Sequence, residues 1–131
     1  MKITLTSIPV RDQAAALTFY TEKLGFVKKA DIPMGEHRWL TVISPQGAEG
    51  VELLLEPLGF PPAKEYYKAL YEASIPVAQF DTDDLDSEVE RMKESGVVFR
   101  GEPVEMDGVR FVIFDDTCGN LVCLTQNVSE K

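Results

Sequence analysis

The chain has 131 residues, 44% of them hydrophobic and 27% charged, a balance typical of one globular domain spanning 1–131 with its own core. Its formal net charge of −9 argues against nucleic acid or an anionic membrane as a partner, because both would repel it, while a cationic small molecule is compatible. No apolar run approaches the roughly 18 residues of a membrane span, and the start MKITLTSIPVRD turns polar too early for a signal peptide, so we expect a cytoplasmic protein.

The predicted elements of the first half begin with an extended segment at residues 2–10. A helix follows, which Asp12 opens and Gly25 ends as a left-handed cap. Its apolar residues recur at helical spacing on one face: Ala16, Phe19, Tyr20 and Leu24. Further extended segments are predicted at about 26–32, 37–44 and 50–56, separated by the turn formers Pro33-Met34-Gly35 and Pro45-Gln46-Gly47.

A short connecting helix is predicted at about 61–73, because the pair Pro61-Pro62 suits a helix start. Large side chains recur on it four residues apart, in the pairs Tyr66 with Leu70 and Tyr67 with Tyr71. We expect these tyrosines to cover core or a subunit surface; a cofactor site is the alternative.

The second half repeats the pattern of the first. An extended segment at 75–82 precedes a helix that Asp83 opens and Gly96 ends, with Leu85, Val89 and Met92 on one face. Extended segments follow at about 97–104, 109–115 and 120–126, with turns at Asp107-Gly108 and Cys118-Gly119-Asn120. The prediction is therefore an α+β fold made of a βαβββ unit twice over, with module 1 at about 2–56 and module 2 at about 75–126.

A doubled βαβββ unit with these motifs resembles the vicinal oxygen chelate superfamily of glyoxalase I, extradiol dioxygenases, and bleomycin- and fosfomycin-resistance proteins. The resemblance runs from about residue 3 to residue 126, and its most specific pieces are Val10-Arg11-Asp12, FYTEKLGF at 19–26, and Gly119-Asn120-Leu121. It implies two curved half-barrel sheets. In the metal-dependent members, it also implies a divalent ion held by His or Gln on the first strand and Glu on the last strand of each module.

Carried over one at a time, those ligand positions hold Leu5, Glu52, Val77 and Cys123 in this chain. Glu52 matches the family, whereas hydrocarbon side chains at 5 and 77 cannot bind a metal and a thiol stands where the enzymes place Glu. His37, the chain's one histidine, lies outside these positions, and we expect a surface or structural role for it. We therefore expect neither the family's metal centre nor another cofactor.

What the resemblance leaves is a cup lined by alternate residues of the strands, a form typical of small-molecule sites. The residues expected to line it are Leu5, Ser7, Glu52, Leu54, Val77, Gln79 and Cys123, with Trp39 as a wall; for Trp39, core packing is the alternative. Glu52 would be costly to desolvate there. Its charge could be offset by Arg38 or Arg110, by protonation, or by a cationic ligand.

Two cysteines, Cys118 and Cys123, fit neither a zinc ribbon nor a CxxC redox pair, and we expect free thiols. A nucleophilic thiol needs a cationic or histidine neighbour. No histidine is predicted to reach Cys123, so a buried inert cysteine is favoured over a catalytic one.

The leading functional hypothesis is a metal-free protein that binds a small molecule, a cationic one among the options, for sequestration or sensing. One alternative is a metal-dependent lyase or dioxygenase of the same superfamily with a divergent site. Another is a structural or regulatory dimer whose cup is filled by its own side chains. The resemblance also implies a homodimer, and it leaves open whether a barrel closes within one chain or across two.

Overall fold

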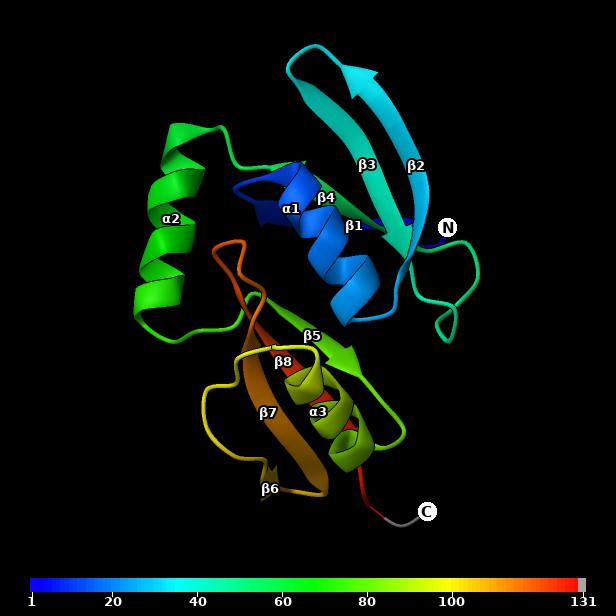
Figure 1. Ribbon diagram of the computed structural model, residues 1–131, viewed down its shortest axis with the longest axis vertical. Helices are drawn as coiled ribbons and strands as arrows, with labels where there is room; N and C mark the ends of the chain where they lie inside the picture. The colour runs from blue at the N-terminus through cyan, green and yellow to red at the C-terminus, as the bar shows by residue number, and fades with distance from the viewer. Residues whose placement is uncertain (130–131) are drawn as a thin grey trace.

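Two four-stranded sheets form the framework of the computed structural model, which describes residues 1–129 (Figure 1). The first sheet, in the order β1-β4-β3-β2, contains β1 (Leu5–Val10), β2 (Val27–Met34), β3 (His37–Ile43) and β4 (Glu52–Pro57). The second sheet, in the order β5-β8-β7-β6, contains β5 (Ala78–Asp81), β6 (Val104–Met106), β7 (Val109–Asp115) and β8 (Leu121–Asn127). In each sheet the first strand of the module runs parallel to its last strand. The predicted α+β fold with a doubled βαβββ unit is thus confirmed, as two open sheets and not a closed barrel.

The helices begin and end close to the predicted residues. The first consists of α1 (Gln13–Thr18) and a π-helical stretch, η1 (Phe19–Lys23), which the spacing of apolar residues does not reveal. Asp12 caps α1 by accepting a hydrogen bond from the Ala15 amide at 3.0 Å, and Gly25 follows η1 at φ +84°. The connecting helix, α2 (Pro61–Glu72), lies where it is predicted. The third, α3 (Leu85–Glu94), is capped by Asp84 and not by Asp83, one residue later than predicted.

One predicted turn belongs to a strand. Pro33 and Met34 continue β2, and the hairpin turns instead at Gly35, where φ is +63°. Because β2 is an edge strand, the missing amide of Pro33 removes no hydrogen bond that the sheet needs.

The segment predicted as a strand at 97–104 is mostly irregular. A single bridge joins Phe99 to Phe114, and regular pairing with β7 resumes only in β6. Gly101 at φ +99° and Pro103, which has no amide hydrogen, interrupt the ladder between these points.

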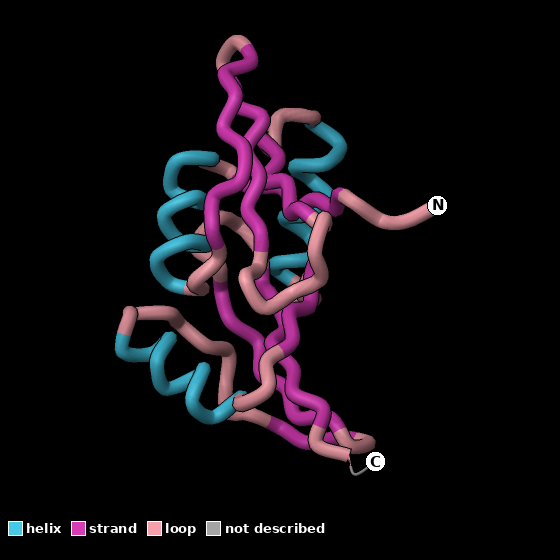
Figure 2. The backbone as a smooth tube through the Cα atoms, turned by 90° about the vertical axis from the view of Figure 1, so that its right-hand side faces the viewer, coloured by secondary structure: helices cyan, strands magenta, loops and turns pink. Residues whose placement is uncertain are grey.

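The helices α1 and α3 lie on the same side of the strands, in front of them in Figure 1, whereas α2 lies on the other side, as the turned view of Figure 2 shows. The side chains between these two helices and the sheets form one buried cluster, with members from both modules that include Ile8, Val10, Tyr20, Leu55, Met92, Phe114 and Leu124. On the opposite side, the start of α2 approaches the first sheet near Trp39 and Leu54. Within residues 1–129 no helix is long and apolar enough to cross a membrane.

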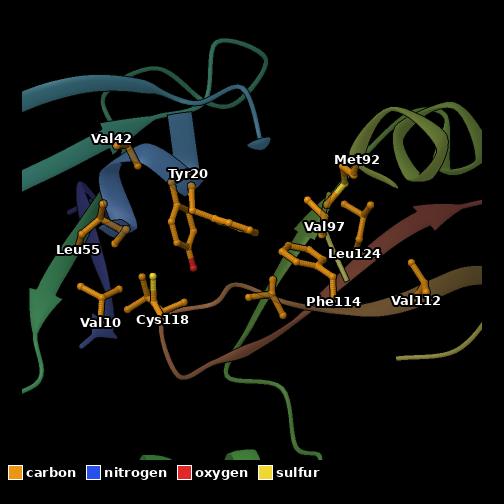
Figure 3. Packing of buried hydrophobic residues seen from close by; sticks show 14 of the residues in the cluster. Val10, Tyr20, Val42, Leu55, Met92, Val97, Val112, Phe114, Cys118 and Leu124 are labelled. Atoms are coloured by element: carbon orange, nitrogen blue, oxygen red, sulfur yellow. The ribbon is translucent and has the colours of Figure 1, made fainter. Parts of the chain in front are cut away.

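A buried carboxylate joins the two modules at the turn between β7 and β8. Asp116 is fully buried and accepts hydrogen bonds from the Tyr20 hydroxyl at 2.6 Å and from the Cys118 amide at 2.7 Å. Asn120 donates to Asp116 as well and, through its side chain, to the carbonyl of Pro9 at 2.6 Å. Figure 3 shows the Tyr20 ring between residues of the two sheets, with its hydroxyl directed toward the turn that carries Cys118. The DDTCGN turn therefore holds module 2 against module 1.

Candidate functional site

The open face of the first sheet, opposite α1, brings together the predicted residues of module 1. Leu5 pairs with Glu52 and Ser7 pairs with Leu54 across β1 and β4. Thr41 of β3 pairs with Leu54 from the other side. Because side chains alternate along a strand, all of these residues point to one face.

On this face Glu52 is held by a hydroxyl group. The Thr41 Oγ1 donates to the Glu52 Oε1 at 2.6 Å and itself accepts a hydrogen bond from the Ala30 amide at 3.1 Å. Thr41 is fully buried, so this hydrogen bond orients the carboxylate from a fixed position.

The two arginines considered as partners of Glu52 are engaged elsewhere. Arg38 donates to both oxygens of Asp31, at 2.9 and 2.7 Å, and this pairing lowers the pKa of Asp31. Arg110 pairs with Asp86 at 2.9 Å. The interpretation that an internal arginine offsets the charge of Glu52 is therefore wrong. The carboxylate instead accepts a hydrogen bond from the neutral hydroxyl of Thr41.

The predicted residues of module 2 lie in or beside the second sheet. Gln79 pairs with Cys123 across β5 and β8, on the face opposite α3. Val77 precedes β5, is partly buried and packs against the main core cluster. The predicted lining residues are thus split between two sheets.

Both thiols are free and poorly suited to nucleophilic chemistry. Burial raises the pKa of Cys123, and burial together with the nearby Asp116 raises the pKa of Cys118 to about 12. A thiolate is therefore disfavoured at neutral pH at either position.

The positions that hold a metal in the enzymes do not fit a divalent ion here. Leu5 and Val77 offer no donor atom, Glu52 has one oxygen engaged by Thr41, and burial disfavours the thiolate of Cys123. Throughout the part of the chain that the structure describes, no group of three or more His, Cys, Asp or Glu side chains is arranged to hold a metal.

A hollow of about 560 Å³ lies on the open face of the first sheet, between β3, β4 and the start of α2; we refer to it as the sheet hollow. Its volume is in the range of sites for small organic molecules. Its lining consists of Pro9, Met34, His37, Arg38, Trp39, Leu54, Glu56, Pro57, Leu58, Gly59, Phe60, Ala63 and Tyr67. Of the predicted residues, Trp39 and Leu54 take part in it.

Several lining residues were not predicted. His37 and Glu56 continue the alternation of Trp39 along β3 and of Leu54 along β4, so strand parity alone would have placed them on this face. Phe60 and Tyr67 come from the segment that leads into and forms α2, and no spacing in the sequence indicates where that helix packs.

The position of α2 is set by its last turn. The Tyr71 hydroxyl donates to a carboxylate oxygen of Asp115, and the guanidinium of Arg100 lies 5.2 Å from the centroid of the Tyr71 ring. Both partners belong to module 2, whereas the start of the same helix closes the sheet hollow over module 1. The connecting helix thus links the second sheet to the candidate site.

A second hollow of about 560 Å³ lies between the turn after β3 and the start of α3. Gln79 is the one predicted lining residue that borders it. The structure therefore does not place Gln79 beside the aromatic residues of the sheet hollow.

Comparison with known proteins agrees with this architecture. The chain is 52% identical over 126 residues to the uncharacterized protein YurT of Bacillus subtilis (strain 168), covering 96% of this chain and 99% of YurT. The crystal structure of UcmS2 superposes with a TM-score of 0.81 at 32% identity, covering 95% of this chain and 97% of that one. TnmS3, an antibiotic binding protein from Streptomyces sp. CB03234, superposes with a TM-score of 0.75 at 34% identity, covering 97% and 96%.

The model of the Glyoxalase/Bleomycin resistance protein/Dioxygenase superfamily matches residues 2–124, which include both modules and the connecting helix. The resemblance drawn from the sequence motifs is confirmed by this match and by the sheet topology. The chain therefore belongs to the glyoxalase/bleomycin resistance protein/dioxygenase superfamily.

Proposed function

We propose that this protein binds a small organic molecule in the sheet hollow and does so without a metal ion. The observation that carries the proposal is the lining of the hollow, in which Trp39 from β3 is joined by Phe60 and Tyr67 from the α2 segment. Aromatic rings around an apolar cavity offer the stacking area that such ligands use. The similarity to TnmS3, an antibiotic binding protein, supports the same class of function.

A metal-dependent lyase or dioxygenase with a divergent site is the alternative. Such chemistry needs a Lewis acid with several protein ligands, and Leu5 and Val77 supply none. Elemental analysis of protein purified without chelators separates the two hypotheses. We expect well below one ion per chain; stoichiometric nickel, zinc, iron or manganese would overturn the metal-free proposal.

A purely structural dimer whose cup is filled by its own side chains is less well supported. Such a protein would leave no room for a ligand, whereas the sheet hollow has a volume of about 560 Å³. We infer a homodimer all the same, because both open faces expose large apolar side chains: Leu5, Ile32 and Met34 in the first sheet, and Val104 and Met106 in the second.

Residues 1–131 would form one domain in each protomer, because a single core cluster includes both modules. Light scattering coupled to size-exclusion chromatography tests the dimer, and a monomer at micromolar concentration would contradict it. The cytoplasmic location stays a prediction.

Ligand binding can be followed through Trp39, the chain's one tryptophan. Acridine, a neutral planar probe, should quench its fluorescence. Calorimetry on Trp39→Leu should give an affinity lower by about tenfold, the loss of one aromatic stacking partner. Unchanged affinity of Trp39→Leu, or no binding of any aromatic compound to the wild type, would refute binding in the sheet hollow.

A further inference from the structure

We infer that the ligand of the sheet hollow is a planar aromatic cation and that Glu56 is the residue that selects its charge. The inference rests on the proposed function, because it concerns the same hollow. It replaces the expectation that Glu52 meets a cationic ligand.

Of the charged side chains that line the sheet hollow, one has no partner of opposite charge among residues 1–129. Arg38 and Glu56 are the lining residues that carry a formal charge, and His37 is a further ionisable lining residue. The guanidinium of Arg38 donates two hydrogen bonds to Asp31, so its charge is already compensated. An anionic ligand would therefore find this guanidinium already paired.

Glu56 differs from Arg38 in having no counter-charge. None of the ion pairs formed within residues 1–129 includes Glu56, and its side chain is exposed. It lies on β4 opposite Pro9, another lining residue, and strand parity places it on the same face as Leu54. A carboxylate at the border of an apolar hollow favours a ligand that brings a positive charge.

Glu52 is less suited to this role. It lies four residues earlier on the same strand, outside the lining of the sheet hollow, and Thr41 already donates a hydrogen bond to it. One oxygen of Glu52 is therefore already engaged, whereas no side-chain hydrogen bond within residues 1–129 engages the carboxylate of Glu56.

The shape of the ligand follows from the walls. The lining includes the aromatic residues Trp39 of β3 and Phe60 and Tyr67 of the α2 segment, which suits a flat ring system. A cationic ring gains further attraction from aromatic faces. The net charge of −9 adds a general preference for cations on approach.

The test uses three probes that share one tricyclic ring: 9-aminoacridine, acridine and acridine-9-carboxylate, which are cationic, neutral and anionic near neutral pH. Affinities are measured by Trp39 fluorescence and calorimetry at low ionic strength. We expect 9-aminoacridine to bind about fivefold tighter than acridine, a partly exposed ion pair's contribution, and the anion to bind most weakly. Added salt should reduce the preference.

Three variants with the same change in net charge show which residue causes the preference for the cationic probe. In Glu56→Gln the ratio of the affinity for 9-aminoacridine to that for acridine should fall to about one. The same ratio should be unchanged in Glu52→Gln and in Glu102→Gln, where Glu102 is an exposed residue of module 2. Loss of the preference in Glu52→Gln with its retention in Glu56→Gln would overturn the inference. Equal binding of all three probes to the wild type would also overturn it, while the proposed function would stand. Failure of every probe to bind would refute both.

Discussion

Replacing Tyr20 by phenylalanine tests the hydrogen bonds that join the two modules. The change removes only the hydroxyl that donates to Asp116 at 2.6 Å and leaves the buried ring in place. Asp116 keeps its donors from the Cys118 amide at 2.7 Å and from the Asn120 amide and side chain, both at 3.0 Å. One buried hydrogen bond to a carboxylate is therefore lost without replacement, and we expect the free energy of unfolding to fall by about 2 kcal/mol.

Urea denaturation followed by circular dichroism measures this loss as a lower midpoint with an unchanged slope. Tyr66→Phe is the matched control, because it removes the same hydroxyl from a residue that is 59% exposed. If Tyr20→Phe costs no more than this control, Asp116 does not depend on the tyrosine, and the account of how the modules are joined is refuted.

Three further predictions concern pH, α2 and a helix end. Burial raises the pKa of Cys118 to about 12 and that of Tyr20 well above its ordinary 10.0, so the folded chain retains protons that the unfolded chain releases. Stability should therefore fall above about pH 9 through Cys118 and above about pH 10 through Tyr20, each by up to about 1.4 kcal/mol per pH unit. Urea titrations between about pH 9 and 10 in which Cys118→Ala loses stability as steeply as the wild type would contradict the contribution of the thiol. Tyr71→Phe should loosen α2 by removing its bond to Asp115, raising amide exchange in residues 61–72 and weakening acridine binding about threefold; unchanged exchange would show that α2 is held otherwise. Gly96→Ala should cost about 1 kcal/mol because φ is +91° there while the space around it is free, and a neutral result in thermal melts would refute backbone strain as the cause.

The residues of the first sheet that share its open face could be predicted because strand alternation is a local property, although only Trp39 and Leu54 of the predicted residues line the sheet hollow. Once β1 and β4 are recognised, Leu5, Ser7, Glu52 and Leu54 must share a face, and the register bears this out. The same parity, carried two residues further, reaches Glu56. The partner of Glu52 was missed because the hydroxyl of Thr41 lies on a third strand, whose register depends on the hairpin and on the pairing of β3 with β4.

The sequence by itself determined the repeated βαβββ order, the helix limits at Asp12 and Gly25, and the faces that the strands present. These features follow from the chain's own periodicity and from backbone preferences that act over a few residues. Only the tertiary structure decided that α2 closes the sheet hollow and that hydrogen bonds at the Asp116 turn join the two modules. Those outcomes depend on Tyr71 reaching Asp115 over 44 residues and Tyr20 reaching Asp116 over 96, and no local pattern encodes contacts at such separations.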